Sequence, residues 1–195
     1  MIFAFPATAK TVLRLHMRGL RKRLAAETPG VAEVAARLAP QGLLASAPIV
    51  AGYRPQGAEI DPWPLMQAFA EAGARLALPV ALHRDEPLAF RAYADGHPLT
   101  PDVFGVPAPT PLAEIVRPGL VIAPLLAFDR WGGRMGQGGG HYDRTLAELR
   151  ASGPVFVLGL AYAGQEVARL PAEPHDQRLD AILTEKGYME AAKEI

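Results

Sequence analysis

Cysteine is absent from the sequence, which excludes disulfide bonds, thiolate metal ligands and cysteine nucleophiles. An excess of charge is also absent, because 20 Lys and Arg residues balance 20 Asp and Glu residues. A nucleic-acid or membrane-surface partner therefore has no general electrostatic support. No apolar run approaches the length of a membrane span, and the N-terminus lacks the basic start and long apolar core of a signal peptide. We expect a cytoplasmic monomer whose partners are small molecules.

The length of 195 residues suits one domain spanning 1–195, and half of the residues are apolar, enough for a sizeable core. We expect residues 1–8 to form a loosely ordered N-terminal segment. Glycine and proline are frequent, with 19 residues each, and they concentrate in 96–119 and 132–140. These two stretches are interpreted as long loops within an ordered chain.

Helical and strand-like patterns alternate along the chain. The predicted helices cover 9–26, 29–39, 62–72, 142–151 and 165–170, and the predicted strands cover 48–53, 75–80, 88–93, 120–123, 154–160 and 179–184. Alternating strands and helices form a mainly parallel sheet covered on both faces. We therefore predict an α/β fold, a three-layer α/β/α arrangement with a mainly parallel central sheet. The N-terminal basic helix is expected to pack on it.

A glycine-rich stretch organises the centre of the sequence. Six glycines lie between 132 and 140, after an apolar segment at 121–125 and before an amphipathic run at 142–149. That order predicts a strand, a glycine loop and a helix. Because glycine has no Cβ, a ligand can approach the backbone, and N–H groups before a helix N-terminus form an anion site. The alternative is a surface loop whose glycines only permit turns.

Charged residues frame these glycines. Asp129 and Arg134 lie at the start of this stretch and Asp143 and Arg144 follow it, a mixture that suits a phosphate with a divalent cation. The loop is not a Walker loop, because no Gly-Lys-Ser/Thr follows. It is not the dinucleotide fingerprint either, because its last glycine position holds His141. Cationic side chains from elsewhere in the chain must therefore contribute to phosphate binding at this loop.

The predicted helix at 9–26 carries two stripes. The apolar stripe consists of Leu13, Met17, Leu20 and Leu24, and the basic stripe consists of Lys10, Arg14, Arg18 and Arg21. The basic stripe has almost no acidic partners within one turn. It is either a solvated helix face or the cluster of unpaired cations that a triphosphate needs.

Glu59 follows the predicted strand at 48–53 and precedes a helix that Asp61 and Pro62 would start. Ligands of open parallel sheets lie at the carboxyl ends of the strands, which is where Glu59 falls. The alternative is a solvent-exposed loop carboxylate.

Several segments of the chain resemble a known family. The stretch FDRWGGRMGQGGGHYDRTL (128–146) is similar to the signature of the 5-formyltetrahydrofolate cyclo-ligases, also called methenyltetrahydrofolate synthetases. Further segments resemble that family in the same order: the Lys10, Leu13, Arg14 and Arg18 spacing, YRPQGAEID (53–61), LPV (78–80), LAFR (88–91), FGVPAP (104–109), IAPLLAFD (122–129), LGLA (158–161) and LPAEPHDQRLDAILTEKG (170–187). The resemblance covers nearly the whole chain.

The resemblance implies an ATP-dependent and magnesium-dependent ligase of folate one-carbon metabolism. In that family's reaction, the formyl oxygen on N5 of 5-formyltetrahydrofolate attacks the γ-phosphate of ATP. N10 then closes the ring and expels phosphate, which gives 5,10-methenyltetrahydrofolate and ADP. Phosphorylation converts a poor leaving oxygen into a good one, so positioning and charge stabilisation are expected to dominate catalysis.

The resemblance also implies roles for individual residues. It assigns ATP binding to Lys10, Arg14, Arg134, Met135, Gly136, Gln137, Gly138, Gly139, Gly140, His141 and Tyr142, and substrate binding to Arg54, Glu59, Gln137, Gly138, Gly139, Gly140 and His141. Lys10, Arg134 and Tyr142 are the implied catalytic residues. Asp143 and Asp180 are the implied Mg²⁺ ligands, since a hard cation prefers oxygen. Asp129 is an alternative metal candidate, and His175 and Asp176 are interpreted as loop-capping residues.

Two residues depart from the family pattern, because Gln137 and His141 stand where the family most often has tyrosine. This departure bears on substrate preference. A folate- or nucleotide-binding protein without turnover is a second hypothesis. A third is a sugar-phosphate enzyme on a similar sheet, because fold alone does not fix chemistry. That third reading leaves the basic helix and Glu59 unexplained.

Overall fold

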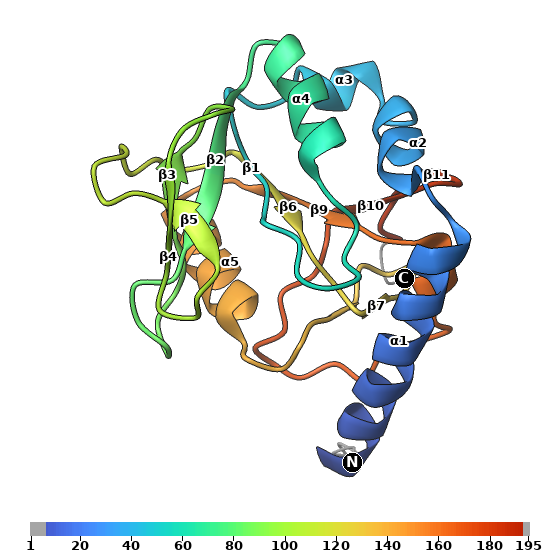
Figure 1. The fold of residues 1–195 in the computed structure, drawn as a ribbon. Coiled ribbons are helices and arrows are strands. Elements are labelled where there is room, and N and C mark those ends of the chain that lie inside the picture. Colours follow the sequence, from blue (N-terminus) through green and yellow to red (C-terminus); the bar gives the residue numbers. More distant parts are fainter. Residues whose placement is uncertain (1–6, 193–195) are drawn as a thin grey trace.

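The computed structural model describes residues 7–192 and confirms the α/β fold. A seven-stranded sheet has the order β11-β10-β9-β6-β1-β2-β3 (Figure 1). Its strands are β1 (Ile49–Ala51), β2 (Arg75–Val80), β3 (Ala89–Ala92), β6 (Leu120–Ala123), β9 (Phe156–Leu160), β10 (Ala181–Thr184) and β11 (Gly187–Glu190). The five central strands are parallel, and the two edge strands, β3 and β11, pair antiparallel.

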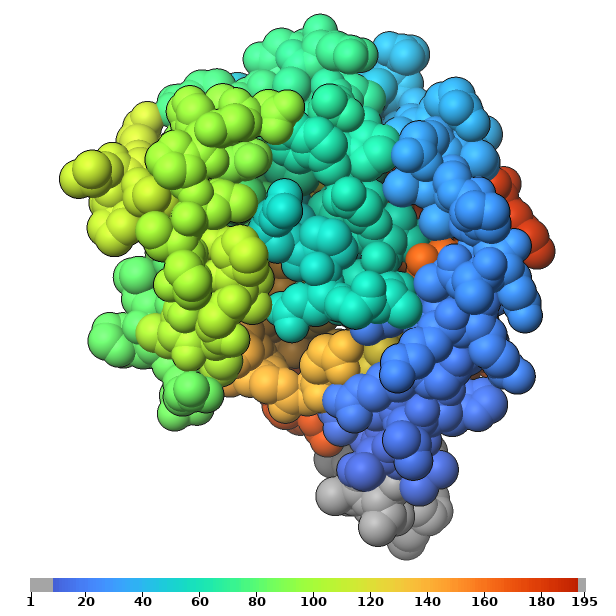
Figure 2. Space-filling view, viewed as in Figure 1, coloured from blue at the N-terminus to red at the C-terminus, as the bar shows by residue number. Residues whose placement is uncertain are grey.

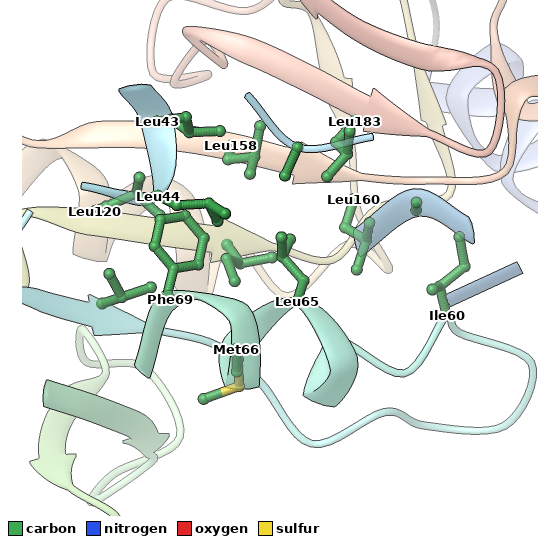
Figure 3. Packing of buried hydrophobic residues seen from close by; sticks show 14 of the residues in the cluster. Leu43, Leu44, Ile60, Leu65, Met66, Phe69, Leu120, Leu158, Leu160 and Leu183 are labelled. Carbon is green, nitrogen blue, oxygen red and sulfur yellow. The ribbon is translucent and has the colours of Figure 1, made fainter. Parts of the chain in front are cut away.

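Helices cover both faces of the sheet, as expected of parallel strands. One face is covered by α2 (Val31–Arg37), α3 (Gln41–Leu44) and α4 (Trp63–Glu71). Figure 3 shows Leu65 and Phe69 of α4 pointing toward the strand residues Leu120 and Leu158. The opposite face is covered by α5 (His141–Ser152), whose Leu146 packs in the second core.

The N-terminal helix α1 (Ala7–Glu27) runs along one side of the molecule (Figures 1 and 2). Its apolar stripe is confirmed, because Met17 is buried with Leu126, Met135 and Leu170, and Leu13 and Leu20 pack against them. These partners belong to the segments beyond the carboxyl ends of the strands, so α1 lies beside the ligand-binding edge of the sheet.

The expectation of a loose segment at 1–8 lies outside the described residues for 1–6, whereas residues 7 and 8 begin α1. The predicted helix at 165–170 is wrong, because the chain there forms only the 3₁₀ turn η1 (Ala163–Gln165). The predicted last strand is followed by β11, which pairs with it as an antiparallel edge.

Two short hairpins replace parts of the predicted loops. The proline-rich segment contains β4 (Leu99–Pro101) and β5 (Pro107–Pro109), and the glycine-rich segment contains β7 (Ala127–Phe128) and β8 (Arg134–Met135). Strands this short leave little periodicity, and proline and glycine are rare in strands, so the sequence patterns missed them. None of the helices between residues 7 and 192 is both long and apolar enough to cross a bilayer.

Candidate active site

A cleft of about 570 Å³ lies beyond the carboxyl ends of the parallel strands. Figure 2 shows the hollow, bordered by the teal segment near residues 53–60 and the orange segment near residue 140. Its lining includes Lys10 and Arg14 of α1; Tyr53, Arg54, Gln56 and Glu59 after β1; residues from 79 to 106 that include Phe104; Pro124 and Leu125 after β6; Arg134 to Asp143; and Leu170, Pro171, Glu173, His175 and Asp176. The structure therefore brings together every predicted site residue except Asp180 and the alternative metal candidate Asp129.

The glycine loop between β8 and α5 forms one wall of the cleft. Gly138 has φ 108° and Gly140, the residue that caps α5, has φ 67°, a region that residues with a Cβ rarely adopt. A Cβ on Gly139 would lie 2.8 Å from Cδ2 of His141. The backbone therefore turns into α5 with no side chains between it and the cleft, as an anion site at a helix N-terminus requires.

The basic face of α1 holds this loop in place. Arg14 donates from Nε to the carbonyl of Gly136 at 3.3 Å, and Arg18 donates from Nε to Oε1 of Gln137 at 2.9 Å. The Gln137 side chain is thus directed at α1. Gln137 still lines the cleft, so its roles in ATP and folate binding stay predictions.

Lys10 is not the unpaired cation that the sequence predicts. Its ammonium lies 2.9 Å from Glu173 and 3.3 Å from Asp176, both on the loop after Leu170. Asp176 also accepts a hydrogen bond from the N–H of Glu173 at 2.8 Å, so its loop-capping role is confirmed. Sequence reasoning missed these partners of Lys10 because more than 160 residues separate them.

Arg134 is nearly enclosed, with 3 % of its side chain exposed. It donates from Nη2 to Oδ1 of Asp143 at 2.9 Å, and its guanidinium lies 5.6 Å from the centre of the Tyr142 ring. Asp143 Oδ1 also accepts from the N–H of Gln177 at 3.1 Å. The buried Nε of Arg134 has no hydrogen-bond partner among residues 7–192.

Tyr142 is held as a neutral phenol. Burial, and then the negative charge of Glu59, raise its pKa above the usual 10.0, and Arg134 only partly offsets them. A phenol that keeps its proton at neutral pH acts as a hydrogen-bond donor and not as a general base.

Glu59 is enclosed, with 9 % of its side chain exposed, so the alternative of a solvent-exposed carboxylate is wrong. Oε1 accepts from Nη1 of Arg21 at 3.1 Å, and Oε2 accepts from the N–H of Gln56 at 2.9 Å. Arg54 lines the cleft from the same loop. These side chains present one fixed negative charge and one cation to a ligand.

Two predicted metal candidates do not line the cleft. Asp180 precedes β10, which places it at the amino end of a parallel strand, and its carboxylate accepts from the N–H of Val157 at 2.7 Å and from Arg150 at 3.2 Å. Its role as a metal ligand stays a prediction that this placement does not favour. Asp129 is buried and accepts from three backbone N–H groups, those of Trp131, Gly133 and Leu170, so it shapes the β7–β8 hairpin.

Phe104 lines the cleft, although no role was predicted for it. Its ring meets the His141 ring edge-on at 4.9 Å between centres, and the Arg84 guanidinium lies 5.2 Å from it. It belongs to the segment FGVPAP, whose resemblance to the family was the only available signal. The β4–β5 hairpin thereby closes the wall opposite α1.

Comparison with known proteins agrees with this geometry. A sequence model of the 5-formyltetrahydrofolate cyclo-ligase family matches residues 6–185. The chain is 35% identical over 153 residues to 5-formyltetrahydrofolate cyclo-ligase of Mycolicibacterium smegmatis, covering 74% of this chain and 77% of that protein. The Escherichia coli K12 protein of the same name is 36% identical over 134 residues, covering 65% and 71%.

Solved structures show the same architecture. The Aquifex aeolicus 5,10-methenyltetrahydrofolate synthetase superposes with a TM-score of 0.73 at 25% identity, covering 95% of this chain and 94% of that one. The Mycoplasma pneumoniae protein of that name superposes with a TM-score of 0.66 at 21% identity, covering 90% and 98%, and supports the fold alone.

Proposed function

The chain belongs to the 5-formyltetrahydrofolate cyclo-ligase family, and from that premise we propose that it uses ATP to convert 5-formyltetrahydrofolate to 5,10-methenyltetrahydrofolate in the cleft beside α1. It is an enzyme, a ligase that acts on a folate. One observation carries the assignment of the site. Cations of α1 and a side-chain-free glycine loop lie in the same cleft as the enclosed carboxylate of Glu59.

The proposed reaction has two steps. The formyl oxygen attacks the γ-phosphorus of ATP, a new P–O bond forms, and the bond to the leaving oxygen of ADP breaks. N10 then attacks the formyl carbon, the C–O bond to phosphate breaks, and the proton of N10 is released. Neither step requires a covalent bond to the protein, so its contribution is positioning and charge stabilisation.

The phosphate side of the cleft would be formed by Lys10, Arg14, Arg134 and the loop from Met135 to Tyr142. Phosphate oxygens would replace the carboxylates of Glu173 and Asp176 around Lys10. The guanidinium of Arg134 and the N–H groups at the start of α5 are hydrogen-bond donors beside the proposed phosphates. Tyr142 would donate its phenol proton as a hydrogen bond while negative charge develops on the transferred group.

The folate side would be formed by Glu59, Arg54 and the wall of Gly138, Gly139, Gly140 and His141. A fixed carboxylate accepts from neighbouring ring N–H and amino groups, as the pterin presents them. The ring of Phe104 and the imidazole of His141 offer aromatic surface next to it.

The donor set of the cleft fits magnesium. Asp143 uses only Oδ1 in its bonds to Arg134 and Gln177, and Glu173 and Asp176 add carboxylate oxygens to the same cleft. Magnesium commonly takes one or two carboxylates together with substrate phosphates. We assign Asp143 as the protein ligand, with Asp176 as the second oxygen donor in place of Asp180. Bound there, the ion would neutralise charge on the phosphates.

A direct assay tests the proposal. Purified protein is mixed with 5-formyltetrahydrofolate, ATP and magnesium, and the near-ultraviolet absorbance of methenyltetrahydrofolate is followed. Absorbance that grows only with ATP and magnesium present is the expected result. Binding of ATP and folate by calorimetry without product would instead favour the binding-protein hypothesis, and Gln137 and His141 would be the first residues to change to tyrosine.

A further inference from the structure

Arg21 differs from the other cations of α1 because it is enclosed, with 7 % of its side chain exposed. Its Nη1 donates both to Oε1 of Glu59 at 3.1 Å and to the carbonyl of Leu125 at 3.3 Å. Glu59 and Leu125 line the cleft and follow two adjacent parallel strands, β1 and β6. Arg21 therefore joins α1 to the carboxyl edge of the sheet from behind the cleft wall.

The arrangement fixes both oxygens of the Glu59 carboxylate. Arg21 holds Oε1, and the N–H of Gln56 holds Oε2. Two phenols lie near that carboxylate. Its negative charge contributes to raising the pKa values of Tyr53 and Tyr142. Glu59 is thus a single oriented negative charge among neutral aromatic groups.

Stability alone is a poor reason for this ion pair. Taking two charges out of water is costly, and apolar residues of similar volume often stabilise a protein as well or better. Arg21 carries a further cost, since its buried Nε has no hydrogen-bond partner among residues 7–192. The pair is better explained by a role in positioning the Glu59 carboxylate at the cleft.

We propose that Arg21 is a positioning residue that keeps the Glu59 carboxylate oriented for the pterin ring of the folate. Arg21 lies about three helical turns after Lys10 on the same helix. One rigid element would therefore serve both substrates, holding the triphosphate through Lys10 and Arg14 and the pterin through Arg21 and Glu59. This inference rests on the proposed function for the identity of the ligand.

The test compares Arg21→Gln, Arg21→Lys and Arg23→Gln, the last making the same charge change at an exposed position of α1. Arg21→Gln is expected to raise KM for 5-formyltetrahydrofolate by about tenfold to a hundredfold, the usual effect of losing a hydrogen bond to a charged group. The KM for ATP should stay within about twofold, and Arg23→Gln should match the wild type. Arg21→Lys keeps the buried charge, so it should recover part of the loss and keep the test usable if Arg21→Gln does not fold.

A double-variant cycle with Glu59→Gln separates positioning from a structural role. If Arg21 acts through Glu59, the double variant should be no worse for folate than the poorer single variant. Additive losses, or equal rises in both KM values that follow a fall in Tm, would overturn the inference.

Calorimetric binding of 5-formyltetrahydrofolate without ATP distinguishes this inference from the proposed function. A wild type that binds folate but forms no product overturns the proposed reaction. The expected weaker folate binding of Arg21→Gln then still supports the role of Arg21. Unchanged folate affinity in Arg21→Gln overturns that role even where turnover is intact, and a wild type that does not bind folate overturns both.

Discussion

Arg134 donates from Nη2 to Oδ1 of Asp143 at 2.9 Å, and both side chains face the cleft from either end of the glycine loop. Arg134 begins β8, whereas Asp143 lies in the first turn of α5. The pair therefore fixes the path of the loop between them. It also places one positive and one negative group where a phosphate and a divalent cation would bind.

Changing Asp143 to Asn should lower kcat by about a hundredfold or more, the usual effect of removing a directly acting charged group. The amide keeps the size of the side chain but removes the charge that would hold magnesium, so the magnesium concentration for half-maximal rate should also rise. Steady-state assays over a magnesium titration measure both effects.

Asp180→Asn is the matched control, because it makes the same chemical change at the carboxylate excluded from the cleft. The amide oxygen can still accept from the N–H of Val157, and the Arg150 pair is part-exposed. Its kcat should stay within about twofold, with less than about 1 kcal/mol lost in the free energy of unfolding. A strong loss in Asp180→Asn with normal rates in Asp143→Asn would reverse the metal assignment.

Changing Lys10 to Met should raise KM for ATP by about tenfold or more, because a charge-assisted contact to phosphate is lost while the apolar stem is kept. The KM for 5-formyltetrahydrofolate should change by less than about twofold. Lys22→Met removes the same charge from an exposed position of α1 and should leave both constants unchanged. Equal rises in both KM values for Lys10→Met would instead indicate that Lys10 and its partners Glu173 and Asp176 only anchor the loop.

The sequence predicted the fold well where an element is long and its pattern is strong. The predicted bounds of β2 and β6 match the structure to the residue, and those of α1 and α5 match within two residues. Apolar burial decides those elements, and burial leaves a periodicity that can be read. The 3₁₀ turn and the hairpins of two or three residues leave no period, so they were missed or assigned wrongly.

The sequence predicted which residues line the candidate site, but it did not predict which of them form ion pairs. Lys10 with Asp176, and Arg21 with Glu59, pair across long stretches of chain, and only the fold brings them together. The metal assignment of Asp180 was carried over by resemblance alone. Residues at the start of a parallel strand lie at the edge opposite to the ligand, so the strand prediction at 179–184 already argued against that assignment.

Gly132 should tolerate no side chain, although it lies outside the cleft lining. It has φ 82°, and a Cβ there would meet the carbonyl oxygen of Leu179 and approach Cβ of Ala191 to 3.0 Å. Gly132→Ala should therefore lower the free energy of unfolding by about 2–4 kcal/mol, through backbone strain and overpacking. Urea titration measures this loss.

Gly19→Ala is the matched control for that substitution. Gly19 lies inside α1, and a Cβ there would meet nothing within 4 Å. Alanine should stabilise the helix by about 0.5–1 kcal/mol, because it restricts the unfolded chain more than glycine does. A Gly132→Ala protein as stable as the wild type would mean that the β7–β8 turn does not lie against Leu179 and Ala191.

The buried tyrosines predict how stability depends on pH. Burial is the main cause that raises the pKa values of Tyr53 and Tyr142 above the usual 10.0. The unfolded chain therefore loses these protons first, so their contribution is complete below about pH 10 and decreases as pH rises beyond it. Each tyrosine should lower the free energy of unfolding by about 1.4 kcal/mol per pH unit in that range.

Urea titrations of the wild type and Tyr142→Phe between about pH 8 and pH 11 measure the share of Tyr142. Phenylalanine keeps the ring beside Arg134 but has no proton to lose, so above about pH 10 the stability of the variant should decrease less steeply, by about 1.4 kcal/mol per pH unit. Groups that titrate in both proteins cancel in this comparison. Equal slopes would mean that Tyr142 loses its proton at the same pH in the folded protein as in the unfolded chain, so that burial and Glu59 do not raise its pKa as described.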